Sequence, residues 1–169
     1  MILTHDVILR LIEAGEIEID PLKVDLIGPG SIDLRLSDQF RVFKQMAGPV
    51  RISEEVDIQE LTELVMVEKE FVLPPGETVL GLTLERIKLP GYLCGWLEGR
   101  SRFARFGLLV HMTAAFIQPG INNRQVLEVS NLAPFPLALP VGSPICQFVF
   151  ERTEGQAVYQ GRHMNQDRL

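Results

Sequence analysis

The sequence predicts a mainly β fold of the sandwich, jelly-roll or barrel type. Residues 71–152 consist of short apolar runs separated by turn signals, among them Pro-Pro-Gly at 74–76 and Pro-Val-Gly at 140–142. This spacing is typical of antiparallel β folds. Residues 17–19 and 32–36 alternate apolar with polar side chains, as half-buried strands do. Because 46% of the 169 residues are apolar, the chain can bury one packed core.

Few helices are expected. Thr4 is placed to cap a helix that ends near Gly15 and whose apolar residues recur at helical spacing. Those apolar residues are Val7, Ile8, Leu11 and Ile12. A second, shorter helix is expected at 100–106, stopped by Gly107. Residues 44–69 are polar and rich in glutamate, so we expect a surface excursion there.

The chain is expected to form one domain over residues 1–169, with 155–169 as a polar C-terminal tail. Its net charge of −6 disfavours general nucleic-acid binding, which usually requires a basic surface. No apolar run reaches the roughly 18–20 residues of a membrane span, and the first residues do not resemble a signal peptide. Cys94 and Cys146 do not suggest a disulfide framework, so a cytoplasmic protein is expected.

The first candidate site is the basic segment Arg100, Ser101, Arg102 and Arg105. Three arginines fall within six positions, and Ser101 and Arg105 are four residues apart, so they share a helical face. Arginine suits bidentate contacts with phosphate or carboxylate groups. The alternative is a solvated helix whose arginines pair with surface carboxylates.

Glu128 is the second candidate. It alternates with Leu127 and Val129 in a strand pattern, so it faces away from the core if these two residues face it. The ordinary explanation is a solvent-facing strand residue. A functional role requires that this face line a cleft or a neighbouring subunit. His111, in an apolar run, is also a candidate, and the ordinary explanation, a structural histidine, is favoured over a functional role.

The tail is a third candidate. Tyr159, Arg162 and Gln166 supply an aromatic ring, a cation and an amide that could close over a phosphorylated ligand as a lid. The alternative is a disordered end. The three histidines and two cysteines show none of the spacings of a zinc site, so no zinc is expected.

Residues 99–108 resemble the GRSSLARLGL signature of dCTP deaminases, which share a superfamily with trimeric dUTPases. The similarity continues through further segments in the same order along the chain. These are 19–21, 30–36, 110–114, 119–120, Leu127-Glu128 with Asn131, and 162–166.

The resemblance implies a distorted jelly-roll or β-barrel subunit of the dUTPase-like type, with a few short helices, assembled as a homotrimer whose active sites lie between subunits. It implies hydrolytic deamination of dCTP to dUTP and ammonia without zinc, with Mg²⁺ bound through the triphosphate. The expected catalytic residues are Glu128, Ser101 and Arg105. The expected substrate-binding residues are Arg100, Ser101, Arg102, Arg105, Thr113, Ala114, Gln118, Val126, Leu127, Glu128, Tyr159, Arg162 and Gln166.

The resemblance also implies how these residues divide the work. Glu128 would move a proton from water to the leaving ammonia, and Arg105 would orient Glu128. Ser101 and the backbone around Ala114 would hold the water and the base, while the remaining cations and the tail would hold the phosphates. One carboxylate can act as both base and acid if its pocket raises its pKa, so a raised pKa is expected for Glu128.

Departures from the family pattern leave alternatives open. Arg102 replaces a second serine, and Gln118 replaces an aspartate that contacts the deoxyribose and activates water in dUTPases. Glutamine cannot act as a base, so Gln118 argues against diphosphatase activity. A dUTP diphosphatase, a bifunctional deaminase and diphosphatase, and a non-catalytic nucleotide-binding trimer are the alternatives to the deaminase.

Overall fold

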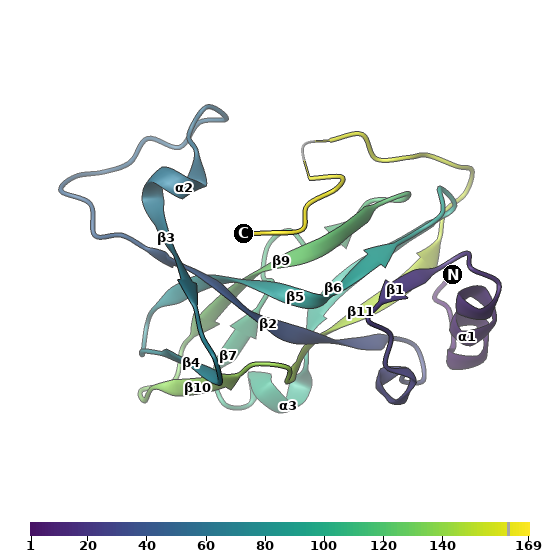
Figure 1. Cartoon of the computed structure of the whole chain (residues 1–169), viewed down its shortest axis with the longest axis horizontal. Helices are drawn as coiled ribbons and strands as arrows, with labels where there is room; N and C mark the ends of the chain where they lie inside the picture. The colour runs from purple at the N-terminus through teal and green to yellow at the C-terminus, as the bar shows by residue number, and fades with distance from the viewer. Residues whose placement is uncertain (162) are drawn as a thin grey trace.

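A computed structural model describes residues 1–161 and 163–169 and confirms the mainly β fold (Figure 1). Within these residues, antiparallel strands form a curled nine-stranded sheet. Along its main path the order is β7 (Leu108–Val110), β9 (Asn122–Asn131), β5 (Thr78–Lys88), β2 (Ile32–Phe43), β11 (Pro144–Arg152), β6 (Leu93–Gly99) and β8 (Phe116–Ile117).

Two further strands join this sheet beside the main path, and a separate pair lies at one end of the molecule. β1 (Glu18–Asp20) pairs with β5, and β3 (Thr62–Met66) pairs with β2. β4 (Glu70–Leu73) and β10 (Leu137–Pro140) form the separate pair. The short helical elements are α1 (His5–Glu13), η1 (Val24–Leu26), α2 (Ile58–Leu61) and α3 (Ser101–Ala104).

The expected helices are present. α1 buries Ile8 and Leu11, and Gly15 adopts a positive φ of 70° just after its end, as a helix-terminating glycine does. Thr4 is the N-cap residue, but its hydroxyl donates to the Asp6 carboxylate at 2.7 Å and leaves the first-turn amides uncapped. The second expected helix corresponds to α3.

The expectation of a surface excursion at 44–69 is wrong in part. Residues 62–66 form β3, which pairs with residues 39–43 of β2 and widens the sheet. The glutamates misled the sequence interpretation because β3 is exposed along most of its length and shows no clear apolar alternation. Residues 44–57 do form an exposed connection, and α2 follows it (Figure 1).

The core lies inside the curl of the sheet and is built by alternation along the strands. β9 illustrates this, because Leu127 and Val129 are fully buried whereas Glu128 between them is not. No helix in the described part of the chain has both the length and the apolar composition to cross a membrane.

Gly95 on β6 sits directly against the aromatic ring of Phe148 on β11, and a Cβ atom at this position would overlap that ring. Phe148 is fully buried and stacks obliquely on Phe150 at 4.7 Å between ring centroids. The two strands are hydrogen-bonded neighbours, so neither can move away without breaking the ladder. Glycine is therefore required at this position for packing.

Gly95→Ala is expected to lower the free energy of unfolding by about 2–3 kcal/mol, because it overpacks a filled core. Urea unfolding of both proteins measures this difference. Gly48→Ala is the matched control, since no atom lies within 4 Å of a Cβ placed there, and it should change the value by less than about 1 kcal/mol. Equal stability of the two variants would show that the sheet adjusts to the added methyl group.

Candidate active site

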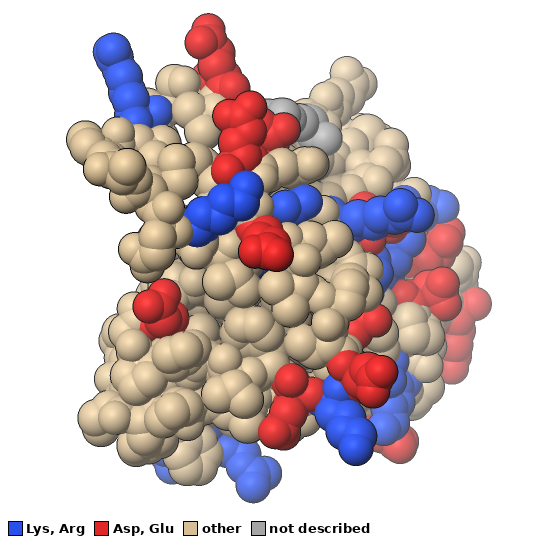
Figure 2. Space-filling model, turned by 60° about the vertical axis from the view of Figure 1, so that its left-hand side comes forward, with Lys and Arg blue, Asp and Glu red and all other residues tan. Residues whose placement is uncertain are grey.

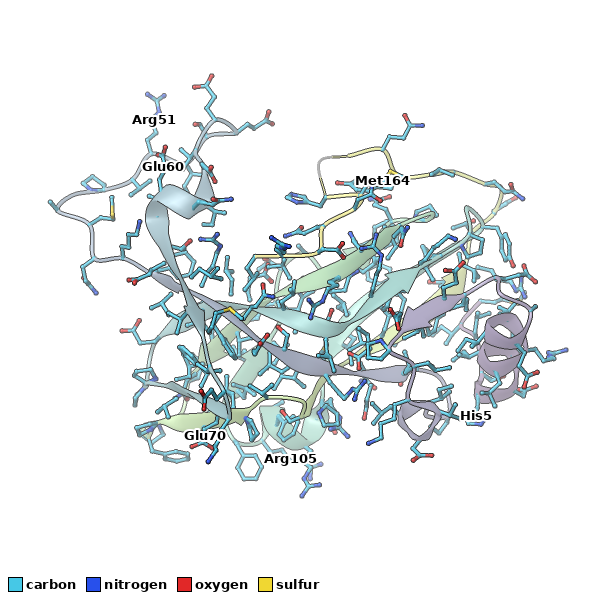
Figure 3. The ribbon with its side chains drawn as sticks, viewed as in Figure 1. His5, Arg51, Glu60, Glu70, Arg105 and Met164 are labelled. Carbon is cyan, nitrogen blue, oxygen red and sulfur yellow. The ribbon has the colours of Figure 1, made fainter. Side chains whose placement is uncertain are left out.

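A broad cavity of about 1290 Å³ lies between one face of β9, the neighbouring strands and the returning C-terminal segment. Figure 3 shows the segment that carries Met164 passing over this side of the sheet. The cavity lining draws on residues far apart in the sequence. It includes Arg41, Leu80, Ala114, Gln118, Val126, Glu128, Tyr159 and Gln166.

Glu128 is placed on the cavity floor by the period-two alternation of β9. Its side chain is 35% exposed, on the face opposite the buried Leu127. Cross-strand pairing puts Leu80 of β5 beside Glu128, and Arg41 of β2 beside Leu80. Directly paired residues on antiparallel strands point to the same side of a sheet, so Arg41, Leu80 and Glu128 form a row across the floor.

His111 is the immediate partner of Glu128. Its backbone has a φ of 57°, and its amide donates to the Glu128 carbonyl at 2.8 Å. This left-handed turn directs the imidazole back toward the strand, where Nδ1 lies 3.1 Å from Glu128 Oε2. Neither of these two buried atoms has another partner among the described residues. His111 is therefore a buried companion of the carboxylate.

The other ring nitrogen of His111 also faces an acceptor. Nε2 lies 3.0 Å from the carbonyl oxygen of Ala114, which can only accept a hydrogen bond. Nε2 must then carry a proton, and a second proton has to lie between Nδ1 and the Glu128 carboxylate. This proton belongs either to an imidazolium beside a carboxylate or to a carboxylic acid beside a neutral imidazole. The pair is thus built to hold one exchangeable proton.

The electrostatics of the pair favour the ion pair, in which Glu128 is ionised and His111 is protonated. Contact with His111 lowers the pKa of Glu128 and outweighs burial, which acts in the opposite direction. Burial by itself lowers the pKa of His111, but the hydrogen bond and charge of Glu128 raise it overall. The expectation that the pocket raises the pKa of Glu128 is therefore wrong for the chain by itself, because the sequence interpretation left out His111.

Several other predicted site residues lie in the same cavity. Ala114, Gln118, Val126, Tyr159 and Gln166 all line it. Two other predicted residues do not line it: Leu127 faces the core with no exposed surface, and Thr113 is exposed beside Ala114. Arg162 falls outside the described residues.

The basic segment lies elsewhere on the chain. Ser101, Arg102 and Arg105 are exposed around α3, and none of them lines the cavity. Figure 3 shows Arg105 at the opposite end of the molecule from Met164. Arg100 already pairs with Asp33 at 2.8 Å and donates to the Pro144 carbonyl at 2.9 Å. A single chain therefore does not bring Ser101 and Arg105 to Glu128.

The sequence made His111 a candidate but favoured a structural role, so it was left out of the predicted site, and Arg41 was missed altogether. Arg41 is 7% exposed, donates to Thr62 Oγ1 and to the Leu169 backbone oxygen, and has no partner for its Nε atom in the described part of the chain. A cation inside an apolar strand pattern was the available signal for Arg41. For His111, the period-two pattern concealed the left-handed turn, which no sequence period reveals.

Metal-binding groups are not clustered in the described residues. No three His, Cys, Asp or Glu side chains come together in residues 1–161 and 163–169 as ligands for one ion. Magnesium held through a triphosphate would not need such a cluster, because Mg²⁺ is commonly bound by substrate phosphates and water. Zinc independence stays a prediction.

Comparison with known proteins gives consistent matches. A family described as dCTP deaminase-like matches residues 2–153. A Parafrankia protein named "dCTP deaminase, dUMP-forming" is 43% identical over 175 residues, covering 98% of this chain and 87% of the relative. A Corynebacterium diphtheriae protein of the same name is 45% identical over 152 residues, covering 88% of this chain and 81% of the relative.

Solved structures agree on the fold. The 2′-deoxycytidine 5′-triphosphate deaminase from Agrobacterium tumefaciens matches 90% of this chain with a TM-score of 0.71 and 25% identity. The match covers 48% of that protein, so this chain spans about half its length. The dUTPase from phage phi11 of Staphylococcus aureus matches 87% of this chain and 96% of that chain with a TM-score of 0.52 and 12% identity. The dUTPase-like fold expected from the sequence is thereby confirmed.

His111→Asn tests the contact with Glu128, since asparagine tolerates the left-handed backbone but carries no charge. Glu128, with its lowered pKa, adds stability that is present above its ordinary pKa of 4.5 and lost as pH falls through the lowered value. His111, with its raised pKa, adds stability that is present below 6.5 and lost as pH rises through the raised value. The wild type should therefore exceed the variant in unfolding free energy most strongly between pH 4.5 and 6.5.

Urea unfolding of wild type and variant across the pH range measures this window. We expect the difference in unfolding free energy between wild type and variant to become smaller below pH 4.5 and above pH 6.5. A difference that does not change with pH would mean that His111 acts through packing alone.

Proposed function

Because this chain belongs to the dCTP deaminase-like family, we propose that it hydrolyses dCTP at C4 of cytosine, giving dUTP and ammonia as the products of that step. The observation that carries the proposal is a carboxylate on the floor of a broad cavity, in contact with a buried histidine. Such a pair has the chemical requirements of a general base and acid.

The proposed reaction follows from the properties of Glu128. Its carboxylate accepts a proton from water as the water oxygen attacks C4 of cytosine, and then gives that proton to N3. The adduct hydroxyl loses a second proton, which passes to the amino group through the same carboxyl. The C–N bond breaks, and ammonia leaves. Water supplies the new carbonyl oxygen and two protons, so the atoms balance.

His111 supports both halves of this cycle. While Glu128 must act as a base, the neighbouring imidazolium favours its ionised form. When cytosine and the lid displace water from the cavity, desolvation raises the proton affinity of the carboxylate, as proton donation requires. Magnesium enters with the triphosphate as part of the substrate. Both cysteines are free and buried, which fits the proposed cytoplasmic setting.

We also propose a homotrimer in which Ser101 and Arg105 act on the cavity of a neighbouring copy. Support comes from their exposure around α3 and from their absence from the cavity that contains Glu128 in the same chain. Arginine from a second copy would supply the cation beside the developing negative charge. A closed ring of three chains would give every cavity one such partner.

Loss of diphosphate is a second candidate step, favoured by the names of the relatives. The Parafrankia and Corynebacterium proteins are named as dUMP-forming, so their final product has lost two phosphates. Gln118, exposed in the cavity lining, is the observation against this step, because an amide cannot accept a proton from water. The alternative of a binding-only trimer is disfavoured by the intact Glu128–His111 pair.

Glu128→Gln is expected to lower turnover of dCTP by at least about 10²-fold while nucleotide affinity changes little, because shape is kept and the base is lost. Chromatography of products measures turnover, and calorimetry measures binding. Glu63→Gln, an exposed glutamate of β3 outside the cavity, is the control and should retain full activity. Turnover of the Glu128 variant near the wild-type rate would remove Glu128 from the mechanism.

The same chromatography identifies the final product. Wild type and Gln118→Asp are each incubated with dCTP and with dUTP in the presence of magnesium. dUMP from the wild type would establish the second step and refute the argument from Gln118. dUTP alone from the wild type, with dUMP appearing only in the aspartate variant, would show that Gln118 has switched the second step off.

Mixing two inactive variants tests whether the site is shared. In co-assembled Glu128→Gln and Arg105→Gln chains, some cavities combine an intact Glu128 with an intact Arg105 from another copy. With equal random mixing, about a quarter of the cavities are complete, so about a quarter of wild-type activity should return. Each variant assembled alone serves as the control. A mixture that stays inactive would place the whole site within one chain.

A further inference from the structure

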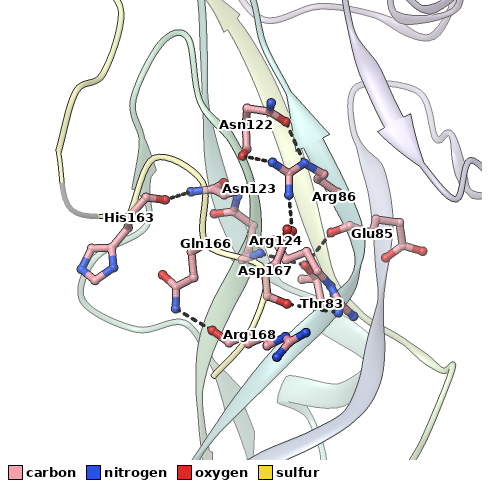
Figure 4. Close-up of polar contacts among 11 residues, drawn as sticks. Thr83, Glu85, Arg86, Asn122, Asn123, Arg124, His163, Gln166, Asp167 and Arg168 are labelled. Atoms are coloured by element: carbon pink, nitrogen blue, oxygen red, sulfur yellow. Dashed lines mark hydrogen bonds and ion pairs between the residues drawn. The ribbon is translucent and has the colours of Figure 1, made fainter. Parts of the chain in front are cut away.

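The N-terminal half of β9 has one open edge. β7 pairs only with residues 129–131 of β9, so residues 122–127 have β5 on one side and no described strand on the other. An open strand edge presents unpaired backbone groups. The C-terminal segment 163–169 lies along this edge (Figure 4).

Backbone hydrogen bonds attach this segment to the edge, although it is a turn at 163–165 and not a strand. The amide of Asn122 donates to the Met164 carbonyl at 3.3 Å, and the amide of Arg124 donates to the Gln166 carbonyl at 2.8 Å. Both bonds run from β9 amides to carbonyls of the segment, while the amides of Met164 and Gln166 donate within the tail, to Gly161 and His163. The Asn123 side chain adds a hydrogen bond of 2.6 Å to the His163 carbonyl.

Charged side chains fix the far end of the segment. The Arg86 guanidinium forms an ion pair with Asp167 and also donates to the side chain and the carbonyl of Asn122, both at 2.8 Å. Arg124 reaches the Asp167 carbonyl at 3.4 Å. Figure 4 shows these contacts side by side, and Figure 2 shows basic and acidic side chains interleaved on the surface.

The ion pair lies beside the cavity and not within it. Neither Arg86 nor Asp167 lines the cavity, whereas Met164 and Gln166 of the same segment do. The contacts of Arg86 and Asp167 are made to protein groups alone, so no atom of a nucleotide is needed to complete them. They hold in place the residues that would cover a ligand.

We propose that Arg86 and Asp167 are positioning residues that latch segment 163–169 onto the edge of β9 before substrate binds. This proposal rests on the proposed function only for the identity of the ligand. If the lid is closed in advance, the free-energy cost of ordering it does not weaken the affinity for the nucleotide. A protein whose competent state is less populated binds its ligand more weakly by the same factor. Breaking the latch therefore weakens substrate binding and leaves the chemical step unchanged.

Arg86→Gln and Asp167→Asn test the latch, and the charge-exchanged double variant R86D with D167R tests the pairing itself. Lys88→Gln is the matched control, because Lys88 lies two residues along the same strand and forms a comparable exposed ion pair with Glu18 at 2.6 Å. The first readout is amide hydrogen exchange of residues 122–124 in the ligand-free protein. The second is the pair of constants KM and kcat with dCTP.

In both single variants we expect exchange at residues 122–124 to become about threefold to tenfold faster and KM to rise by a similar factor, with kcat within about twofold of wild type. The double variant should recover both values in part, and Lys88→Gln should match the wild type. Unchanged exchange in the single variants would overturn the latch. Faster exchange with unchanged KM would overturn the positioning role.

If the wild type does not turn over dCTP, the proposed function fails but the latch remains testable. Amide exchange needs no substrate, and the dissociation constant for dCTP measured by calorimetry replaces KM. The same two results then decide the outcome. Faster exchange together with weaker binding supports the latch, and unchanged exchange overturns it.

Discussion

β9 is the element on which the rest of the site depends. Within one chain, half of one edge of this strand has no strand partner, and part of one face stays uncovered. Backbone amides at an open edge need acceptors, and the tail carbonyls of Met164 and Gln166 supply them. The exposed face keeps Glu128 accessible. One strand thus positions both the reactive carboxylate and the segment that covers it, so that lid and carboxylate share one rigid support.

The contact between Glu128 and His111 shows how one carboxylate can serve opposite roles. In the open cavity, His111 favours the ionised carboxylate. Glu128 keeps a side chain that is 35% exposed, so water still solvates it before a ligand arrives. In the proposed mechanism, a base that covers that surface removes the water and shifts the balance toward the protonated form. Substrate binding would then prepare Glu128 to donate a proton after it has accepted one.

The sequence was sufficient for the features that depend on local periodicity. It predicted α1, the outward orientation of Glu128, and the fold class, through alternation and turn residues. It failed for β3, where exposure on both sides of the strand removes the apolar pattern. It also failed for His111, because a positive φ at a non-glycine residue is imposed by tertiary contacts that no period encodes. Arg41 was not predicted as a site residue for a related reason, because its position in the row with Leu80 and Glu128 depends on strand register.

The placement of charge explains why such a site should be divided between copies. The chain is acidic overall, with a net charge of −6, yet a nucleotide triphosphate needs concentrated cations. Arg41, Arg124 and Arg168 of the same chain already line the cavity, and Arg41 lies in the row with Glu128. In the proposed trimer, the arginines exposed around α3 stay solvated until another copy brings them to the cavity. Assembly would then add their positive charge, and the tail would cover the place where Glu128 and His111 lie in contact.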